Sequence, residues 1–152
     1  MEFAKKTYDP EAKGPLDGLR VLDMTRLVAG NMLRLQLADY GAEVIKLEML
    51  PKGDPLRAWR TEGVAASWKV DGRNKKSVSV NFREQEGLDL ILRLAETADA
   101  FIENMKPGRL EEMGIGPEAL HARNPNLIIT RVTGFGQTGP YSQRPGYDFL
   151  IQ

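Results

Sequence analysis

The fold is decided by residues 19–48, LRVLDMTRLVAGNMLRLQLADYGAEVIKLE. The aliphatic and β-branched run Leu19–Met24 predicts a strand, and apolar residues recur near helical spacing over Asn31–Ala38. Asn31 is the expected N-cap of this helix, and Gly41 is its expected C-terminal stop. The run Ala42–Glu48 predicts a second strand. A strand, a helix and a strand this close together form a βαβ unit, whose strands are parallel and whose crossover is right-handed.

The rest of the chain continues the alternation of strands and helices. Further strands are expected at 77–81, 98–103 and 127–132, and helices at 84–97, 107–113 and 117–123. Residues 51–71 show no regular period and predict a long loop that carries Trp59 and Trp68. These tryptophans are candidates for stacking on a base, but covering the sheet edge or a partner chain is favoured. The alternation predicts an α/β fold with an open, mostly parallel sheet.

Ligands of open parallel sheets bind beyond the carboxyl ends of the strands. In this chain those ends are followed by residues 25–30, 49–53, 81–83, 104–108 and 134–147. These segments hold many of the glycines and polar residues of the chain. The sequence therefore predicts a binding site at this edge of the sheet, without naming the ligand.

One of these segments, Gly134–Gly139, has the spacing G-x-G-x-x-G. In a dinucleotide-binding fold the third glycine opens a helix whose N-terminus faces the pyrophosphate. Here Pro140 follows at once, and Pro145 and Gly146 keep the chain irregular. A glycine-rich surface or active-site loop is therefore favoured, and an NAD-dependent dehydrogenase ranks last among the functions considered.

The composition is that of an ordinary soluble globular domain. Lys plus Arg and Asp plus Glu both number 21, so no overall field favours nucleic acid or a membrane. There are no cysteines, which excludes disulfides and Cys-type zinc sites, and the single His121 cannot form a histidine metal site alone. The polar N-terminus lacks the apolar core of a signal peptide, and no run approaches the ~18 apolar residues of a membrane span. A cytoplasmic protein without a bound metal is expected.

Five successive blocks together carry a resemblance to a known family. They are GLRVLDMTRLVAG, LADYGAEVIKLE, GRNKKSVSVN, FIENMKPGRLEEMGIG and NPNLIITRVTGFGQTGPYSQRPGYD. Over residues 14–152 the chain resembles the family III CoA-transferases, which include formyl-CoA:oxalate and carnitine CoA-transferases and α-methylacyl-CoA racemase. The resemblance implies a Rossmann-like domain that binds CoA, followed by a small domain, in a homodimer of two interlocked chains.

The resemblance also implies a reaction. An Asp carboxylate of the family attacks an acyl-CoA thioester, and CoA passes through an aspartyl thioester to a carboxylic acid, which is covalent catalysis. The family's nucleophile would lie beyond Gln152. At the other end, residues 1–15 are expected to be a flexible leader that ends at Gly14-Pro15. Residues 16–152 are expected to be the N-terminal CoA-binding α/β domain, truncated before the catalytic Asp and the small domain and inactive alone.

The resemblance places CoA contacts in four segments. They are Val28 and Ala29 after the first strand, Val80, Asn81, Phe82 and Arg83 after the third, Asn104, Met105 and Lys106 after the fourth, and Tyr147 and Asp148 near the thioester. Two positions depart from the family pattern. Met49 stands where many members have Arg or Pro, and Glu112 stands where others have a basic residue, so phosphate contacts there are not expected.

Two alternatives to a transferase stay open. The racemase pattern has His where this chain has Tyr147, and a phenol, which ionises only near about pH 10, is a poor base at neutral pH. This difference favours the transferase. A non-catalytic CoA-binding or truncated subunit is the second alternative. Among the acidic residues, Asp148 is interpreted as a helix cap close to CoA rather than as a catalytic acid, and Asp23 as structural.

Overall fold

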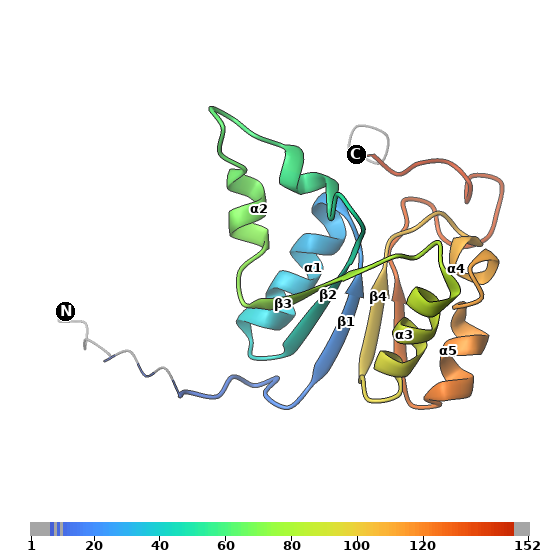
Figure 1. Ribbon diagram of the computed structural model, residues 1–152, viewed down its shortest axis with the longest axis horizontal. Helices are drawn as coiled ribbons and strands as arrows, with labels where there is room; N and C mark the ends of the chain where they lie inside the picture. Colours follow the sequence, from blue (N-terminus) through green and yellow to red (C-terminus); the bar gives the residue numbers. More distant parts are fainter. Residues whose placement is uncertain (1–6, 8, 10, 148–152) are drawn as a thin grey trace.

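The computed structural model describes residues 7, 9 and 11–147 and contains a five-stranded sheet (Figure 1). Its strands are β1 (Arg20–Met24), β2 (Glu43–Met49), β3 (Lys75–Val80), β4 (Ala100–Glu103) and β5 (Ile128–Arg131). They lie in the order β3-β2-β1-β4-β5, and every neighbouring pair is parallel. The predicted open α/β fold is confirmed. The strand order reverses between β1 and β4, and such a switch point is where ligands of these sheets bind.

Helices cover both faces of the sheet. Figure 1 shows α1 (Leu27–Asp39) and α2 (Ala66–Asp71) on one face and α3 (Gln85–Ala95), α4 (Arg109–Glu112) and α5 (Pro117–Arg123) on the other. The strands alternate accordingly: Val21 packs with Ala38 of α1, whereas Leu22 packs with Ile91 of α3. Because both faces are covered, the central strands bury side chains on both sides, and most of these are apolar. The exceptions are the charged residues Asp23, Lys46, Glu48 and Glu103.

Most predicted boundaries agree with the structure, since the elements after residue 76 begin and end within two residues of the expected positions. The segment 51–71 is not one continuous loop, because it contains α2 and the 3₁₀ helix η1 (Pro55–Ala58). Within it the guanidinium of Arg57 stacks 4.0 Å above the ring of Trp68, while Trp59 is exposed. In the described part of the loop after β5, no helix follows Gly139, as predicted.

The predicted start of α1 is wrong. The helix begins at Leu27 rather than after Asn31, and Asn31 is buried in its first turns instead of capping it. Arg26 is the N-cap and makes no side-chain cap bond. A carboxylate far along the chain replaces the cap, because Asp54 Oδ1 accepts the backbone N–H of Leu27 at 3.2 Å. The predicted stop at Gly41 is confirmed by its left-handed φ of +102°.

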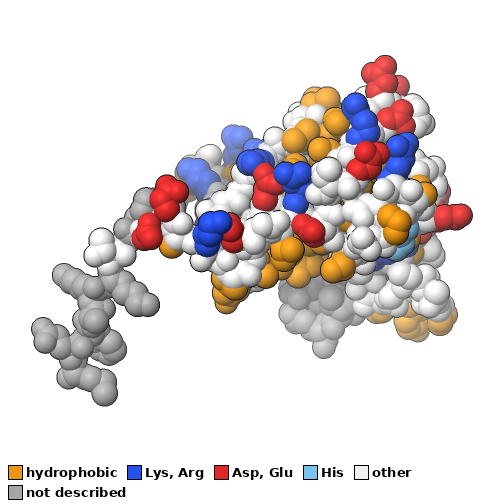
Figure 2. All heavy atoms as spheres, turned by 90° about the horizontal axis from the view of Figure 1, so that it is seen from below, with side chains coloured by type: hydrophobic (Ala, Val, Ile, Leu, Met, Phe, Trp, Pro, Cys, Tyr) orange, Lys and Arg blue, Asp and Glu red, His pale blue; other side chains and the backbone are white. Residues whose placement is uncertain are grey.

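The surface carries charges of both signs. Figure 2, the view from below, shows acidic and basic side chains intermixed, with small groups of apolar side chains between them. Ion pairs such as Lys76 with Glu43 and Arg123 with Glu96 account for part of this pattern. In residues 7, 9 and 11–147 we find no helix with both the length and the apolar character needed to cross a membrane.

Candidate functional site

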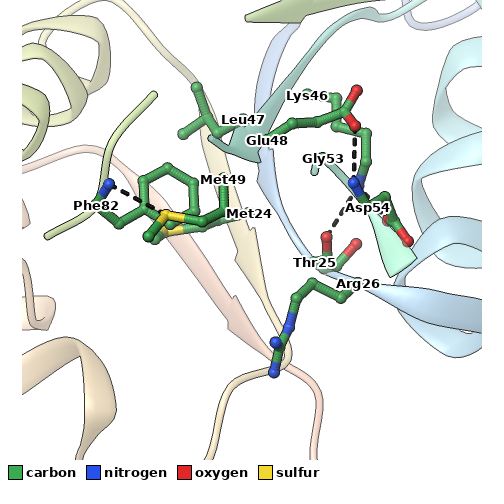
Figure 3. Close-up of a pocket in the computed structure, with 10 residues that line it drawn as sticks. All are labelled: Met24, Thr25, Arg26, Lys46, Leu47, Glu48, Met49, Gly53, Asp54 and Phe82. Atoms are coloured by element: carbon green, nitrogen blue, oxygen red, sulfur yellow. Dashed lines mark hydrogen bonds and ion pairs between the residues drawn. The ribbon is translucent and has the colours of Figure 1, made fainter. Parts of the chain in front are cut away.

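A small cavity of about 20 Å³ lies where β1, β2 and β3 end (Figure 3). Its lining residues are Met24, Thr25, Arg26, Lys46, Leu47, Glu48, Met49, Gly53, Asp54 and Phe82. A cavity of this size has room for about one water molecule. Any larger ligand at this edge would therefore lie across the surface of the loops and not inside the sheet.

Beside the cavity lies a buried charge cluster made of Asp23, Asn31, Arg34, Lys46 and Asp54, all almost fully excluded from solvent. The Lys46 ammonium lies 2.9 Å from Asp54 Oδ2 and 3.5 Å from Asp23 Oδ2. The Arg34 Nε lies 2.6 Å from the same Asp23 oxygen. Two acids thus face two bases. Burying charge without such pairing would cost several kcal/mol per ion.

The pKa values in the buried charge cluster reflect both burial and pairing. Burial alone would raise the pKa of the Asp54 carboxyl, yet that pKa is lowered, because Lys46 and the N–H of Leu56 bond its charged form. Burial lowers the pKa of Arg34, and the nearby Asp23 opposes this shift. The Asp54 carboxylate is therefore held ionised by its partners.

The cluster fixes the turn that follows β1. Thr25 donates its N–H and hydroxyl to Asp23 Oδ1, at 2.8 and 2.6 Å, and its carbonyl accepts from Lys46 at 2.9 Å. Asn104, after β4, accepts from Arg26 N–H at 2.8 Å and donates to Arg26 O at 2.7 Å. Leu27 has a φ of +60°, which costs a branched L-residue about 1–2 kcal/mol. Side chains from β1, β2 and two loops thus hold a strained turn.

The loop after β2 is fixed through Glu48. Its carboxylate accepts two bonds from Arg57, at 2.7 and 2.6 Å, one from the Ser77 hydroxyl at 2.6 Å and one from Asp54 N–H at 2.9 Å. Burial opposes ionisation, but these donors outweigh it and lower the pKa of Glu48 to about 2. The donors come from β3 and η1, so one side chain joins β2, β3 and the loop.

The low pKa of Glu48 predicts a pH dependence of stability. Because the folded value lies below the ordinary value, Glu48 stabilises the fold fully above about pH 4.5, and this contribution is lost as the pH falls toward 2. We expect Glu48→Gln to be less stable than the wild type by a constant amount above about pH 5. The difference should shrink steadily between pH 4.5 and 2, as measured by urea unfolding across this range.

The exposed Glu86 in the first turn of α3 provides the control. Glu86→Gln should leave the difference from wild type small at every pH. A gap between wild type and Glu48→Gln that stays the same down to pH 2 would contradict the assigned role of Glu48.

The residues predicted to contact CoA differ in burial and in their position in the fold. Val28 and Ala29 are exposed in the first turn of α1, and Phe82 lines the cavity. Val80 is buried in the core, so only its backbone could face a ligand. Asn81 Oδ1 accepts the N–H of Arg83 and shapes the turn after β3.

The remaining candidates follow β4 and β5. Asn104 and Met105 are half-buried, and Lys106 is exposed. Tyr147 is 64% exposed. Asp148 lies outside the described residues. The parallel sheet brings the segments after β1, β3 and β4 to one edge, whereas no described contact joins Tyr147 to them.

Four exposed cations lie at this edge, and one of them, Lys52, follows β2. Arg26, Arg83 and Lys106 follow β1, β3 and β4, and within residues 7, 9 and 11–147 none of them has an acidic partner within 4 Å. Arg109, by contrast, pairs with Glu112 at 2.8 Å. Figure 3 shows the Arg26 side chain directed away from Asp54 and Lys46. The edge therefore carries positive charge that the described residues do not neutralise.

Arg26 was not among the predicted contacts, and neither was the buried charge cluster. The signal for the cluster was Lys46 in the middle of an apolar strand, where a charge is rarely buried without a partner. Nowhere in the described part of the chain do three His, Cys, Asp or Glu side chains converge as they would around a metal ion.

Comparisons with known proteins identify the family and support the fold. The model of CoA-transferase family III matches residues 16–152. Over 136 residues, 88% of this chain, the sequence is 50% identical to the succinyl-CoA–D-citramalate CoA-transferase of Chloroflexus aurantiacus and covers 34% of that protein. It is 44% identical to the human succinyl-CoA:glutarate CoA-transferase over 137 residues, covering 88% of this chain and 31% of that protein.

A solved structure gives the same result. The crystal structure of a CAIB/BAIF family protein from Brucella suis superimposes with a TM-score of 0.86 at 45% identity, over 93% of this chain and 39% of that one. The chain thus spans about a third of the length of the curated relatives named above. Because the family model matches residues 16–152, nearly the whole of this chain, the chain belongs to CoA-transferase family III.

Proposed function

We propose that the protein moves CoA from an acyl-CoA thioester to a carboxylic acid, and that this chain forms its CoA-binding part. The observation that carries the proposal is the set of exposed cations Arg26, Arg83 and Lys106 at the carboxyl ends of the strands. Two of them, Arg26 and Lys106, follow β1 and β4, the strands on either side of the switch point. CoA bears a diphosphate and a 3′-phosphate, and guanidinium and ammonium groups form strong charge-assisted bonds to phosphate. Three cations on three loops match a ligand with several separated phosphate groups.

The chemistry proposed for the whole protein is covalent. A carboxylate supplied beyond Gln152 attacks the thioester carbonyl, the CoA thiolate leaves, and a mixed anhydride forms. The thiolate then attacks the enzyme's side of the anhydride, which releases the first acid and leaves an aspartyl-CoA thioester. The acceptor carboxylate next attacks the aspartyl thioester, which expels the CoA thiolate and forms a second mixed anhydride. The thiolate then attacks the acceptor's carbonyl of this anhydride, which gives the new acyl-CoA and releases the aspartate carboxylate. The part of this chain is to bind CoA through these steps.

The proposed donor is a short dicarboxylic acyl-CoA such as succinyl-CoA. The relatives named above include a citramalate and a glutarate transferase, both with succinyl-CoA in their names. The proposed assembly is the interlocked homodimer of the family, in the cytoplasm. A racemase is the alternative. Because the exposed Tyr147 stands where that pattern needs a His base, the transferase is preferred.

Removing the three cations tests CoA binding. Arg26→Gln, Arg83→Gln and Lys106→Gln should each raise the Kd for CoA about 10-fold, since a bond to a charged group contributes about 1.5–3 kcal/mol. The triple variant should lose about 100-fold or more. Isothermal titration with CoA and with 3′-dephospho-CoA would show which cation meets the 3′-phosphate.

Arg123→Gln is the matched control, because Arg123 is an exposed arginine on α5 that pairs with Glu96. It should bind CoA as the wild type does. A triple variant that also binds CoA with unchanged affinity would overturn the proposed site. If CoA binds but no CoA passes from succinyl-CoA to glutarate or another carboxylic acid, the binding proposal survives and the transferase proposal fails.

A further inference from the structure

We propose that Asn104 is a positioning residue: it holds the turn after β1 in the strained conformation that presents its neighbours to CoA. The inference rests on the proposed CoA-binding function. It also revises the role that the sequence predicts for Asn104, which is a direct contact with CoA. Three features of the structure carry it, namely the pairing of Asn104, the backbone of Leu27 and the position of the turn.

The Asn104 amide is engaged with backbone from a distant part of the chain. Its Oδ1 accepts the Arg26 N–H at 2.8 Å, and its Nδ2 donates to the Arg26 carbonyl at 2.7 Å. One side chain thus bonds both the backbone N–H and the backbone carbonyl of a residue 78 positions away. The pairing joins the loop after β1 to the loop after β4, and the strand order reverses between these two strands. An amide used in this way ties two loops together.

The residue next to this pairing is strained. Leu27 has a φ of +60°, a conformation that branched L-residues rarely adopt. Such a conformation persists only where the surroundings hold it, and it concentrates at functional sites. Here the Leu27 N–H is held by Asp54 Oδ1 at 3.2 Å, and the preceding Arg26 is held on both sides by Asn104. Asn104 and Asp54 therefore act together on one turn.

The strained turn sets the direction of the groups around it. Val28 and Ala29 follow Leu27 directly and are exposed, and the Arg26 side chain precedes it. Without Asn104, the Arg26 peptide is free to rotate and Leu27 can relax to a negative φ. The first turn of α1 would then shift relative to Lys106 on the neighbouring loop. Affinity for CoA should fall, while the chemical steps, which use groups elsewhere, should keep their rate.

The test is Asn104→Ala in the full-length protein. The KM for the acyl-CoA should rise about 10-fold with kcat within about 2-fold, as expected for the loss of two hydrogen bonds that act on binding. Hydrogen exchange of a peptide covering residues 25–31, followed by mass spectrometry, should become faster. A role as a direct ligand of CoA would raise KM in the same way without changing this exchange.

A second substitution tests the strain itself. Asparagine tolerates a positive φ far better than leucine does. Leu27→Asn in the Asn104→Ala background should therefore return KM to within about 3-fold of wild type and restore slow exchange in residues 25–31. A direct contact between Asn104 and CoA could not be rescued in this way.

Asn124 supplies the matched control, because its amide also donates to two backbone carbonyls, those of Ala95 and Ala98, and lies near the starts of β4 and β5, away from the carboxyl ends of the strands. Asn124→Ala should leave KM unchanged. Unchanged exchange in Asn104→Ala, no rescue by Leu27→Asn, or an equal rise in KM in Asn124→Ala would each overturn the proposal. If the wild type bound no CoA, the proposed function would fail and Asn104 would position nothing for CoA, whereas the exchange data would still show whether it holds the turn.

Discussion

Replacing Lys46 by methionine is expected to lower the free energy of unfolding by about 3–5 kcal/mol, the range seen when one partner of a buried ion pair is removed. Methionine fills much of the same volume, so the loss comes from charge and hydrogen bonds. The Asp54 carboxylate would lose its only cation within 4 Å among the described residues, and the Thr25 carbonyl and Asn31 amide would each lose a donor. Urea unfolding at neutral pH measures the change.

Lys76→Met is the control for this prediction. Lys76 also lies in a strand and also pairs with a carboxylate, Glu43, but its side chain is 71% exposed. Exposed pairs contribute about 0–1 kcal/mol, so the same substitution should have little effect there. The double variant Lys46→Met/Asp54→Asn should recover part of the loss, because no unpaired carboxylate is left buried at that position. Equal effects of Lys46→Met and Lys76→Met would refute the role assigned to the buried charge cluster.

The fold could be predicted because the sequence patterns that specify it are local. The apolar run of β1, the helical spacing of α1 and the run of β2 lie within 30 residues of one another, and each pattern fixes one element. The start of α1 could not be predicted in the same way. Its first N–H is accepted by Asp54, 27 positions away, and only the folded sheet brings that carboxylate to the helix.

The sequence predicts which loops form the candidate site, but not the contacts that fix the shape of these loops. The rule that ligands bind at the carboxyl ends of strands located the segments that hold Val28, Arg83 and Lys106. The pairing of Asn104 with Arg26 spans 78 positions, and no sequence pattern in either segment predicts it. In the sequence, Lys46 is visible only as a charge within an apolar strand, and the folded sheet is needed to place its partners Asp23 and Asp54 beside it.

Gly30→Ala tests the close packing between α1 and the turn after β1, and we expect it to lower the free energy of unfolding by about 1–2 kcal/mol. A Cβ on Gly30 would lie 2.1 Å from the Thr25 Cβ, 2.4 Å from its Oγ1 and 2.5 Å from its Cγ2. Thr25 cannot easily move aside, because Asp23 and Lys46 hold both its backbone and its hydroxyl. Overpacking of a rigid site typically costs about 1–3 kcal/mol. Alanine favours a helix interior by about 1 kcal/mol over glycine, so the clash must exceed that gain.

The identity of the clashing atoms sharpens this prediction. Thr25→Ala keeps the Cβ at 2.1 Å and should not rescue Gly30→Ala, whereas Thr25→Gly removes all three atoms and should. The double variant Thr25→Gly/Gly30→Ala should therefore be more stable than the sum of the single losses predicts, by about 1–3 kcal/mol of coupling. CoA affinity should follow the same order, since the turn and the first residues of α1 move with Thr25. If the losses of the two single variants simply add in the double variant, the Cβ of residue 30 does not clash with Thr25. In that case α1 moves away from the turn, and the conformation of Leu27 does not depend on the packing of α1 against β1.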